Sequence, residues 1–126
     1  MDARSRIEAY YDALRDGDSL TPFFAHDDSL AKFGISETLV GSTAVREGLT
    51  EQTRSTTDWT VGSESLRVTE RADVAWFTDS VRMAWTDRGD GTRHEFDSRW
   101  SGTLERRGEP PTWRFVGMHV SAPQQL

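Results

Sequence analysis

Apolar and polar residues change their spacing once along the chain, near Thr57. Before this point apolar residues recur with the period of a helix. After it they alternate with polar residues over four long runs, as is typical of half-buried β-strands. We expect strands at Asp58–Thr69, Val74–Thr86, Arg93–Glu105 and Thr112–Ser121. The turns between them are rich in Gly, Pro and Asp, so the second half of the chain predicts an antiparallel meander.

The clearest helix is predicted over residues 2–16, where apolar side chains recur every three or four positions. Asp2 is a suitable N-cap and Gly17 a suitable C-cap. The apolar face of this helix consists of Ile7, Tyr10, Tyr11 and Leu14. We expect this face to cover the apolar side of the sheet.

Two more helices and two short strands are predicted in the first half. They are a short helix starting at Ser19 or Thr21 with Pro22 in its first turn, strands at Leu30–Phe33 and Thr38–Val40, and a helix capped by Ser42 or Thr43 that runs to about Arg54. The predicted fold class is therefore α+β: a single domain over residues 1–126, with three N-terminal helices packed on a strongly curved antiparallel sheet.

Charge and composition narrow the classes of function. The formal net charge of −6 argues against nucleic acid as a partner, because binding to phosphates needs a cationic surface. The absence of cysteine excludes disulfides, thiolate zinc sites and cysteine nucleophiles. No apolar run approaches the roughly 20 residues of a membrane span, and the N-terminus is polar. We expect a cytoplasmic protein with no membrane partner.

Arginine greatly outnumbers lysine among the basic residues. Lys32 is the only lysine, against fourteen arginines, and Asp outnumbers Glu. Acidic surfaces with almost no lysine resemble those of halophilic proteins, where the acidic excess keeps a protein soluble in a salt-loaded cytoplasm. A GC-rich genome would produce the same preference for arginine. Both explanations stay open at the level of sequence.

Four segments carry a family resemblance. Tyr10–Asp18, Phe23–Asp28, Gly41–Glu47 and Trp113–Ser121 resemble, in order and spacing, motifs of the NTF2-like superfamily, the last segment being similar to the final strand of its SnoaL-like branch. The resemblance implies a cone-shaped α+β fold with a pocket at its wide end. It also implies a homodimer formed through the outer face of the sheet. The superfamily contains isomerases, polyketide cyclases, dehydratases and proteins without catalysis, so the fold does not choose a function.

A ketosteroid isomerase mechanism fits the sequence poorly. Tyr10 falls where the resemblance places the oxyanion-hole tyrosine. The position of the general base falls on or next to Phe33, which cannot accept a proton, and that of the second acid falls near Ser101. Two of the three catalytic roles are therefore missing.

His119 and Arg99 support an alternative enzyme hypothesis. His119 shares its alternation phase with Trp113 and Phe115, so it is predicted to face the apolar side, where it could act as acid or base in cyclase, isomerase or hydratase chemistry. It could equally be a structural histidine with a satisfied hydrogen bond. Arg99 could anchor a ligand oxygen, or form an ion pair on the outer face of the sheet.

The leading hypothesis is a protein that binds a small hydrophobic ligand in the cone. Its predicted pocket consists of Tyr10, Phe33, Glu37, Trp85, Arg99, Trp100 and His119. Asp79 interrupts an apolar phase and is expected to form an ion pair with Arg99 or Arg82. The three histidines lack metal-ligand spacing, and no phosphate-binding glycine loop occurs, so we expect no metal and no cofactor.

Overall fold

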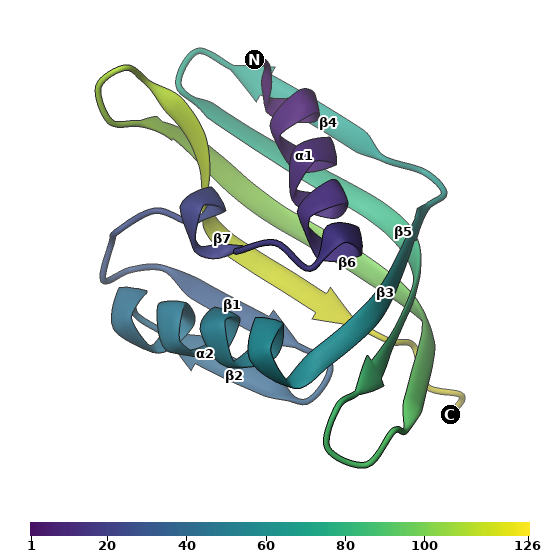
Figure 1. The fold of residues 1–126 in the computed structure, drawn as a ribbon. Helices are drawn as coiled ribbons and strands as arrows, with labels where there is room; N and C mark the ends of the chain where they lie inside the picture. Colours follow the sequence, from purple (N-terminus) through teal and green to yellow (C-terminus); the bar gives the residue numbers. More distant parts are fainter.

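The computed structural model describes residues 1–126, and its elements lie in one curved layer of strands with helices on one side (Figure 1). In chain order the elements are α1 (Ala3–Asp16), a 3₁₀ turn (Thr21–Phe23), β1 (Ala31–Gly34), β2 (Glu37–Val40), α2 (Ser42–Ser55), β3 (Thr56–Ser63), β4 (Arg67–Arg71), β5 (Val74–Asp87), β6 (Arg93–Arg107) and β7 (Thr112–Ser121). The predicted α+β class is confirmed.

The strands form one sheet in the order β2-β1-β7-β6-β5-β3, with β4 also paired to β5. All neighbouring pairs are antiparallel except β1 and β7, which run parallel. The predicted antiparallel sheet therefore contains one parallel pair and is mixed. The parallel pair arises because most of the chain lies between β1 and β7, so no hairpin constrains their relative direction.

The predicted strand Asp58–Thr69 is in fact two strands. β3 pairs with the second half of β5, where Ser63 lies opposite Val81, and β4 pairs with the first half, where Arg67 lies opposite Thr78. The intervening residues leave the sheet and rejoin it along the same edge of β5. Both strands pair with β5, so the alternation of apolar and polar residues continues from one to the other and the sequence shows no break between them.

The helices number two rather than the predicted three, since the segment around Pro22 forms only a 3₁₀ turn. At the first helix the predicted caps are confirmed: the Asp2 side chain accepts a hydrogen bond from the Ser5 N–H, and Gly17 adopts φ 72°. At α2 the N-cap is Gly41, with φ 91°, instead of Ser42 or Thr43. A positive φ at this position favours glycine over a hydroxyl residue.

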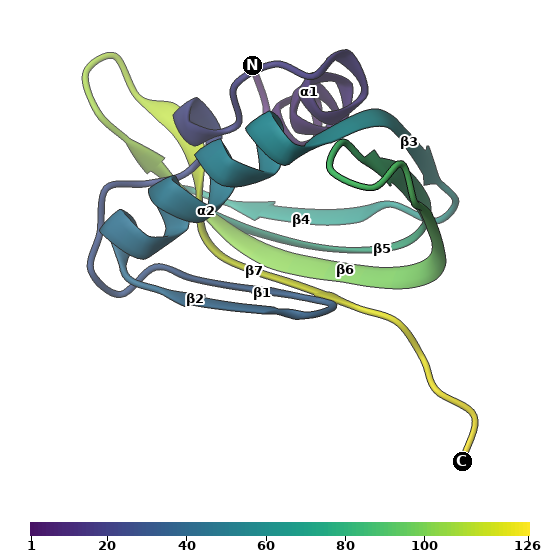
Figure 2. The same ribbon diagram turned by 60° about the horizontal axis from the view of Figure 1, so that its bottom comes forward.

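Both α-helices lie on the same face of the sheet, and the opposite face is left uncovered (Figure 2). The core lies between the helices and the sheet, and its fully buried aromatic side chains are Tyr10, Tyr11, Phe24, Phe77 and Phe115. Edge-to-face contacts join Tyr10 to Phe24 and Phe115, with ring centroids 5.7 and 5.1 Å apart. Neither helix combines the length and the apolar character needed to cross a membrane.

Candidate functional site: the interior cavity

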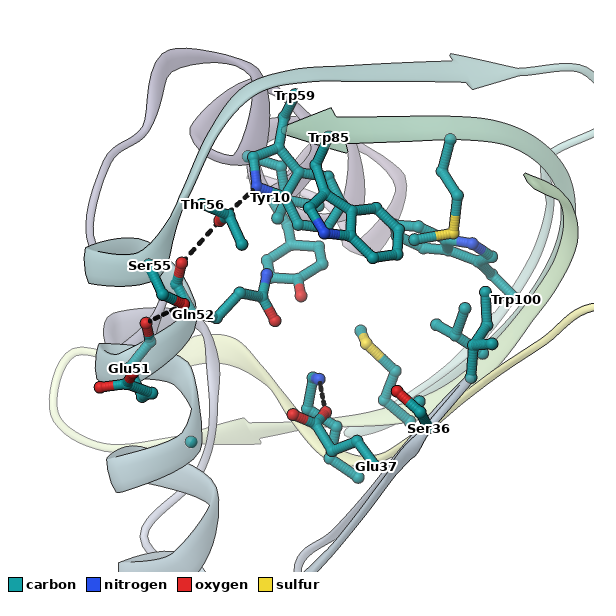
Figure 3. A pocket seen from close by; sticks show the side chains of 18 residues that line it. Tyr10, Ser36, Glu37, Glu51, Gln52, Ser55, Thr56, Trp59, Trp85 and Trp100 are labelled. Carbon is teal, nitrogen blue, oxygen red and sulfur yellow. Dashed lines mark hydrogen bonds and ion pairs between the residues drawn. The ribbon is translucent and has the colours of Figure 1, made fainter. Parts of the chain in front are cut away.

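A cavity of about 300 Å³ lies between α2 and the inner face of the sheet (Figure 3). We call it the interior cavity. Its lining comes from α1, the β1–β2 hairpin, α2, the start of β3 and strands β5 to β7. Segments far apart in the sequence therefore converge on one site.

Tryptophan and methionine side chains form much of the cavity wall. Trp59 and Trp85 stack with ring centroids 5.0 Å apart, and the Trp59 Nε1–H donates to Thr56 Oγ1 at 2.8 Å. Trp100 is held by its own hydrogen bond, from Nε1 to Ser98 Oγ at 2.9 Å. The remaining apolar lining consists of Leu14, Ile35, Met83, Met118 and Val120. These fixed walls suit an apolar ligand.

Lys32 is the only cationic residue in this lining. It is only 5% exposed, and its Nζ forms an ion pair with Glu37 Oε1. Strand alternation in β1 turns Lys32 inward and leaves Phe33 exposed, and Gly34 provides space for Glu37: a Cβ on this glycine would lie 3.2 Å from Glu37 Oε1. The hairpin therefore places both charges of the pair at the cavity.

The Tyr10 hydroxyl is the second polar group that faces the interior cavity. Tyr10 is 2% exposed, and its hydroxyl makes no hydrogen bond within the chain, pointing instead into the cavity near Gln52 (Figure 3). Burial raises the pKa of Tyr10 above its ordinary value, and Glu37 raises it further. The hydroxyl therefore stays protonated near neutral pH and can donate a hydrogen bond to a ligand oxygen.

Four of the predicted pocket residues, Tyr10, Glu37, Trp85 and Trp100, line the interior cavity. Phe33, Arg99 and His119 do not line it, because all three side chains are exposed on the opposite face of the sheet; Arg99 and His119 line a separate, more polar hollow. The ring of His119 lies 5.8 Å from that of Phe33, and His119 makes no hydrogen bond. Its prediction as a hydrogen-bonded structural histidine was therefore also wrong.

A β-bulge in β7 explains the error at His119. Thr103 of β6 pairs with Gly117, whereas the next residue, Leu104, pairs with Phe115, so Val116 is an extra residue in the ladder. An inserted residue reverses the alternation of the side chains that follow it. Phe115 is therefore buried before the bulge, whereas Met118 and Val120 are buried after it and His119 is exposed.

Asp79 is buried, but it does not form the predicted ion pair. Its carboxylate accepts hydrogen bonds from the Tyr11 hydroxyl at 2.9 Å, the Ser63 hydroxyl at 2.6 Å and the Ser65 N–H at 2.9 Å. Arg82 binds Asp97 instead, with Nη1 and Oδ1 3.1 Å apart. Hydrogen-bond donors thus satisfy Asp79 where a cation was expected.

Lys32 is the one cationic residue of the site, and the sequence prediction missed it. The available signal was its status as the only lysine in a chain rich in arginine, at a position next to an expected pocket residue, Phe33. No group of three or more His, Cys, Asp or Glu side chains is arranged to hold a metal ion. The groups best placed for chemistry in the interior cavity are therefore the Tyr10 phenol, the Lys32 amine and the Glu37 carboxylate, in a lining of which half is apolar.

The sequence matches the SnoaL-like domain family over residues 3–125, and the chain belongs to that family. Among solved structures it is similar to an NTF2-like superfamily protein from Salmonella enterica serovar Typhimurium, at 16% identity over 96% of this chain and 88% of the other, with a TM-score of 0.80. An NTF2-like protein of unknown function in nutrient uptake from Rhodospirillum rubrum matches at 17% identity over 98% and 100% of the two chains, with a TM-score of 0.79.

A ketosteroid isomerase-like protein from Erwinia carotovora is also similar, at 15% identity over 97% and 94% of the two chains and a TM-score of 0.75. At these identities the likeness shows a shared fold and carries no activity to this chain. No curated protein sequence matches the chain. The function has to be argued from the interior cavity itself.

Proposed function

We propose that this protein binds a small, largely apolar molecule in the interior cavity, with one oxygen of the ligand directed at Tyr10. The observation that carries the proposal is the hydroxyl of the buried Tyr10 side chain, which makes no hydrogen bond within the chain and points into a cavity of about 300 Å³. Buried polar groups are normally satisfied, so an unpartnered donor in a cavity indicates a place for a ligand acceptor or water. The volume lies at the lower end of the range for small-molecule sites.

The charges of the cavity favour an uncharged ligand. Lys32 is already paired with Glu37, so these two side chains together contribute no net charge, and Glu51, the other charged residue of the lining, is paired with Arg54. A ligand carboxylate would be brought close to Glu37 and would also lose its hydration, and both effects cost free energy. A carbonyl or hydroxyl oxygen avoids both costs and can accept from Tyr10. The ligand class is therefore an apolar aldehyde, ketone or alcohol.

Catalysis by His119 receives no support from this geometry. A general acid or base has to lie within hydrogen-bond reach of the proton it transfers. His119 is exposed on the outer face, and the sheet separates it from the interior cavity. A ligand bound in the cavity would not meet this side chain.

Titration with 2-naphthalenemethanol tests the binding proposal. Three tryptophans, Trp59, Trp85 and Trp100, line the cavity, so saturable shifts of their indole N–H signals in NMR spectra should report occupancy. Tyr10→Phe removes only the hydroxyl and should weaken binding about five- to tenfold, the effect of one lost hydrogen bond. The matched control, His119→Gln, alters a ring outside the cavity and should bind as the unmodified protein does.

Two results would contradict the proposal. One is a lack of saturable shifts at any of the three cavity tryptophans. The other is an equal affinity of Tyr10→Phe and the unmodified protein for 2-naphthalenemethanol, which would show that the hydroxyl does not contact the ligand. A third comparison tests the charge argument: 2-naphthoate, which has a carboxylate in place of the alcohol, should bind more weakly than 2-naphthalenemethanol.

A further inference from the structure

We propose that Lys32 forms a covalent imine with the carbonyl carbon of an aldehyde or ketone bound in the interior cavity. The inference rests on the proposed function, because the carbonyl compound has to occupy the same cavity. It goes further in assigning a reaction to a side chain: nucleophilic attack by the amine on a ligand of defined class. Lysine amines are established nucleophiles toward carbonyl groups when they lie in desolvated sites.

The position of Lys32 gives the first argument. The side chain extends from β1 into the cavity lining, is only 5% exposed, and has no partner other than Glu37. It is also the only lysine of the chain, so this amine occurs where apolar walls surround it and at no surface position. A carbonyl compound that enters the cavity meets this one side-chain amine.

The ion pair has little structural justification of its own. Replacing a buried ion pair by apolar residues of similar volume is often neutral or stabilising, because desolvation offsets much of the attraction. The pair also lines the interior cavity, so part of its surface faces open space instead of packed side chains. A role toward a ligand explains why an amine and a carboxylate are kept together at this place.

Glu37 completes the proton balance. The ammonium transfers a proton to the Glu37 carboxylate, and the neutral amine attacks the carbonyl carbon to form a carbinolamine. The proton that the attacking nitrogen releases passes to the former carbonyl oxygen and makes it a hydroxyl. This hydroxyl leaves as water after receiving a proton from the Glu37 carboxyl group, and a protonated C=N bond, paired with the regenerated Glu37 carboxylate, replaces C=O. No oxidant or reductant is needed, and the products are one imine and one water. The carboxylate already contacts Nζ, so each proton has a short path.

Tyr10 and the tryptophan walls complete the site. The Tyr10 hydroxyl can donate to the carbonyl oxygen and increase the positive charge on the carbon under attack. The stacked Trp59 and Trp85 provide an apolar face against which the apolar part of the carbonyl compound can pack. Each of these residues thus contributes in a different way to formation of the imine at Lys32.

Reductive trapping tests the inference. The unmodified protein is incubated with 2-naphthaldehyde and sodium cyanoborohydride, and the sites of attachment are mapped by peptide mass spectrometry. The exposed amino group of Met1 serves as an internal reference, because it is the only other amine in the chain. We expect Lys32 to acquire one naphthylmethyl group at least as fast as Met1 does, and 2-naphthalenemethanol to slow labelling at Lys32 alone.

Two variants refine the test. Lys32→Arg keeps the positive charge and cannot form the imine, so labelling should remain only at Met1. Glu37→Gln removes the proton acceptor and should slow labelling at Lys32 about a hundredfold, the usual scale of general acid–base catalysis. If a variant fails to fold, the competition by 2-naphthalenemethanol in the unmodified protein still decides the question.

The possible results separate the two proposals. Binding of 2-naphthalenemethanol together with labelling at Met1 alone would overturn the imine and leave the binding proposal standing. Labelling at Lys32 that 2-naphthalenemethanol does not slow would overturn the inference, since the reaction would then not depend on the interior cavity. Failure of both compounds to bind would overturn both proposals.

Discussion

Lys32 and Asp79 are the two buried side chains that carry a formal charge, and their surroundings differ. Asp79 accepts three hydrogen bonds from neighbouring groups and has no contact with the interior cavity. Lys32 has a single partner, Glu37, and faces the cavity. A closed set of hydrogen bonds indicates a structural role, whereas an incompletely surrounded amine leaves room for a ligand.

Substitution of Asp79 should therefore affect stability strongly. Asp79→Ala leaves the buried Tyr11 hydroxyl without its acceptor and removes two further hydrogen bonds, so unfolding free energy should fall by about 2–4 kcal/mol. The control is Asp97→Ala, which breaks an exposed ion pair with Arg82 and should cost about 0–1 kcal/mol. Equal losses for the two variants in urea unfolding curves would contradict the structural role of Asp79.

The two tyrosines should resist ionisation for as long as the protein is folded. Burial raises the pKa of both Tyr10 and Tyr11, with smaller contributions from Glu37 and Asp79 respectively. A raised folded-state pKa adds stability that is fully present below the unfolded value of about 10 and is lost as pH rises through the folded value. Phenolate absorbance and circular dichroism should therefore change together in an alkaline titration. Absorbance that rises near pH 10 in a folded protein would contradict this.

At the scale of the elements, α1 is the helix whose ends are best defined by local chemistry. The Asp2 carboxylate accepts from the Ser5 N–H at 2.8 Å, and Gly17 has the positive φ of a helix C-cap. Asp2→Ala should reduce unfolding free energy by about 1 kcal/mol, whereas Asp2→Asn retains a capping oxygen and should change it little. Gly17→Ala should cost about as much as Asp2→Ala, because alanine is strained at φ 72°. Thermal melts of the three variants provide the measurement.

Local signals of this kind account for what the sequence could predict. The caps of α1, the inward face of that helix and the positions of β5 and β6 depend on residues close together in the chain, and all were predicted correctly. In the cavity, three residues that the same reasoning named, Tyr10, Trp85 and Trp100, lie in the lining. These residues lie on elements whose periodicity is uninterrupted near the site.

The failures share one cause, which is pairing between distant strands. The bulge at Val116 is defined by the register between β6 and β7, and it turns His119 outward although every second residue before it is buried. The parallel contact of β1 with β7 likewise decides that Lys32 faces the cavity and Phe33 does not. No periodicity within one segment contains this information.

At the scale of the whole molecule, the uncovered face of the sheet calls for an explanation. It carries two exposed aromatic side chains, Trp76 at 46% and Phe33 at 38%, on a surface that no helix covers (Figure 2). We propose that a second copy of the chain packs on this face, as the family resemblance implies. Sedimentation equilibrium should give the mass of a homodimer, and Trp76→Ser combined with Phe33→Ser should shift it toward the monomer. A monomer at all concentrations would contradict the proposal.

The overall charge predicts a dependence of stability on salt. The chain has 21 acidic and 15 basic residues, and Asp79 is the only acidic residue in the buried core, so mutual repulsion acts across the surface at low ionic strength. In molar potassium chloride the screening length falls to about 3 Å, which removes most of this repulsion. The melting temperature should therefore rise steeply between dilute buffer and molar salt if the protein is adapted to a salt-loaded cytoplasm.

A charge variant separates this cause from a general effect of salt on apolar burial. Asp16 and Asp18 are exposed and form no ion pair, so Asp16→Asn combined with Asp18→Asn changes the net charge from −6 to −4 without removing a contact. Repulsion then contributes less at low salt, and the melting temperature of this variant should rise less between dilute buffer and molar potassium chloride. If the unmodified protein itself shows a flat response, the preference for arginine over lysine reflects genome composition instead, and the predicted adaptation to salt is wrong.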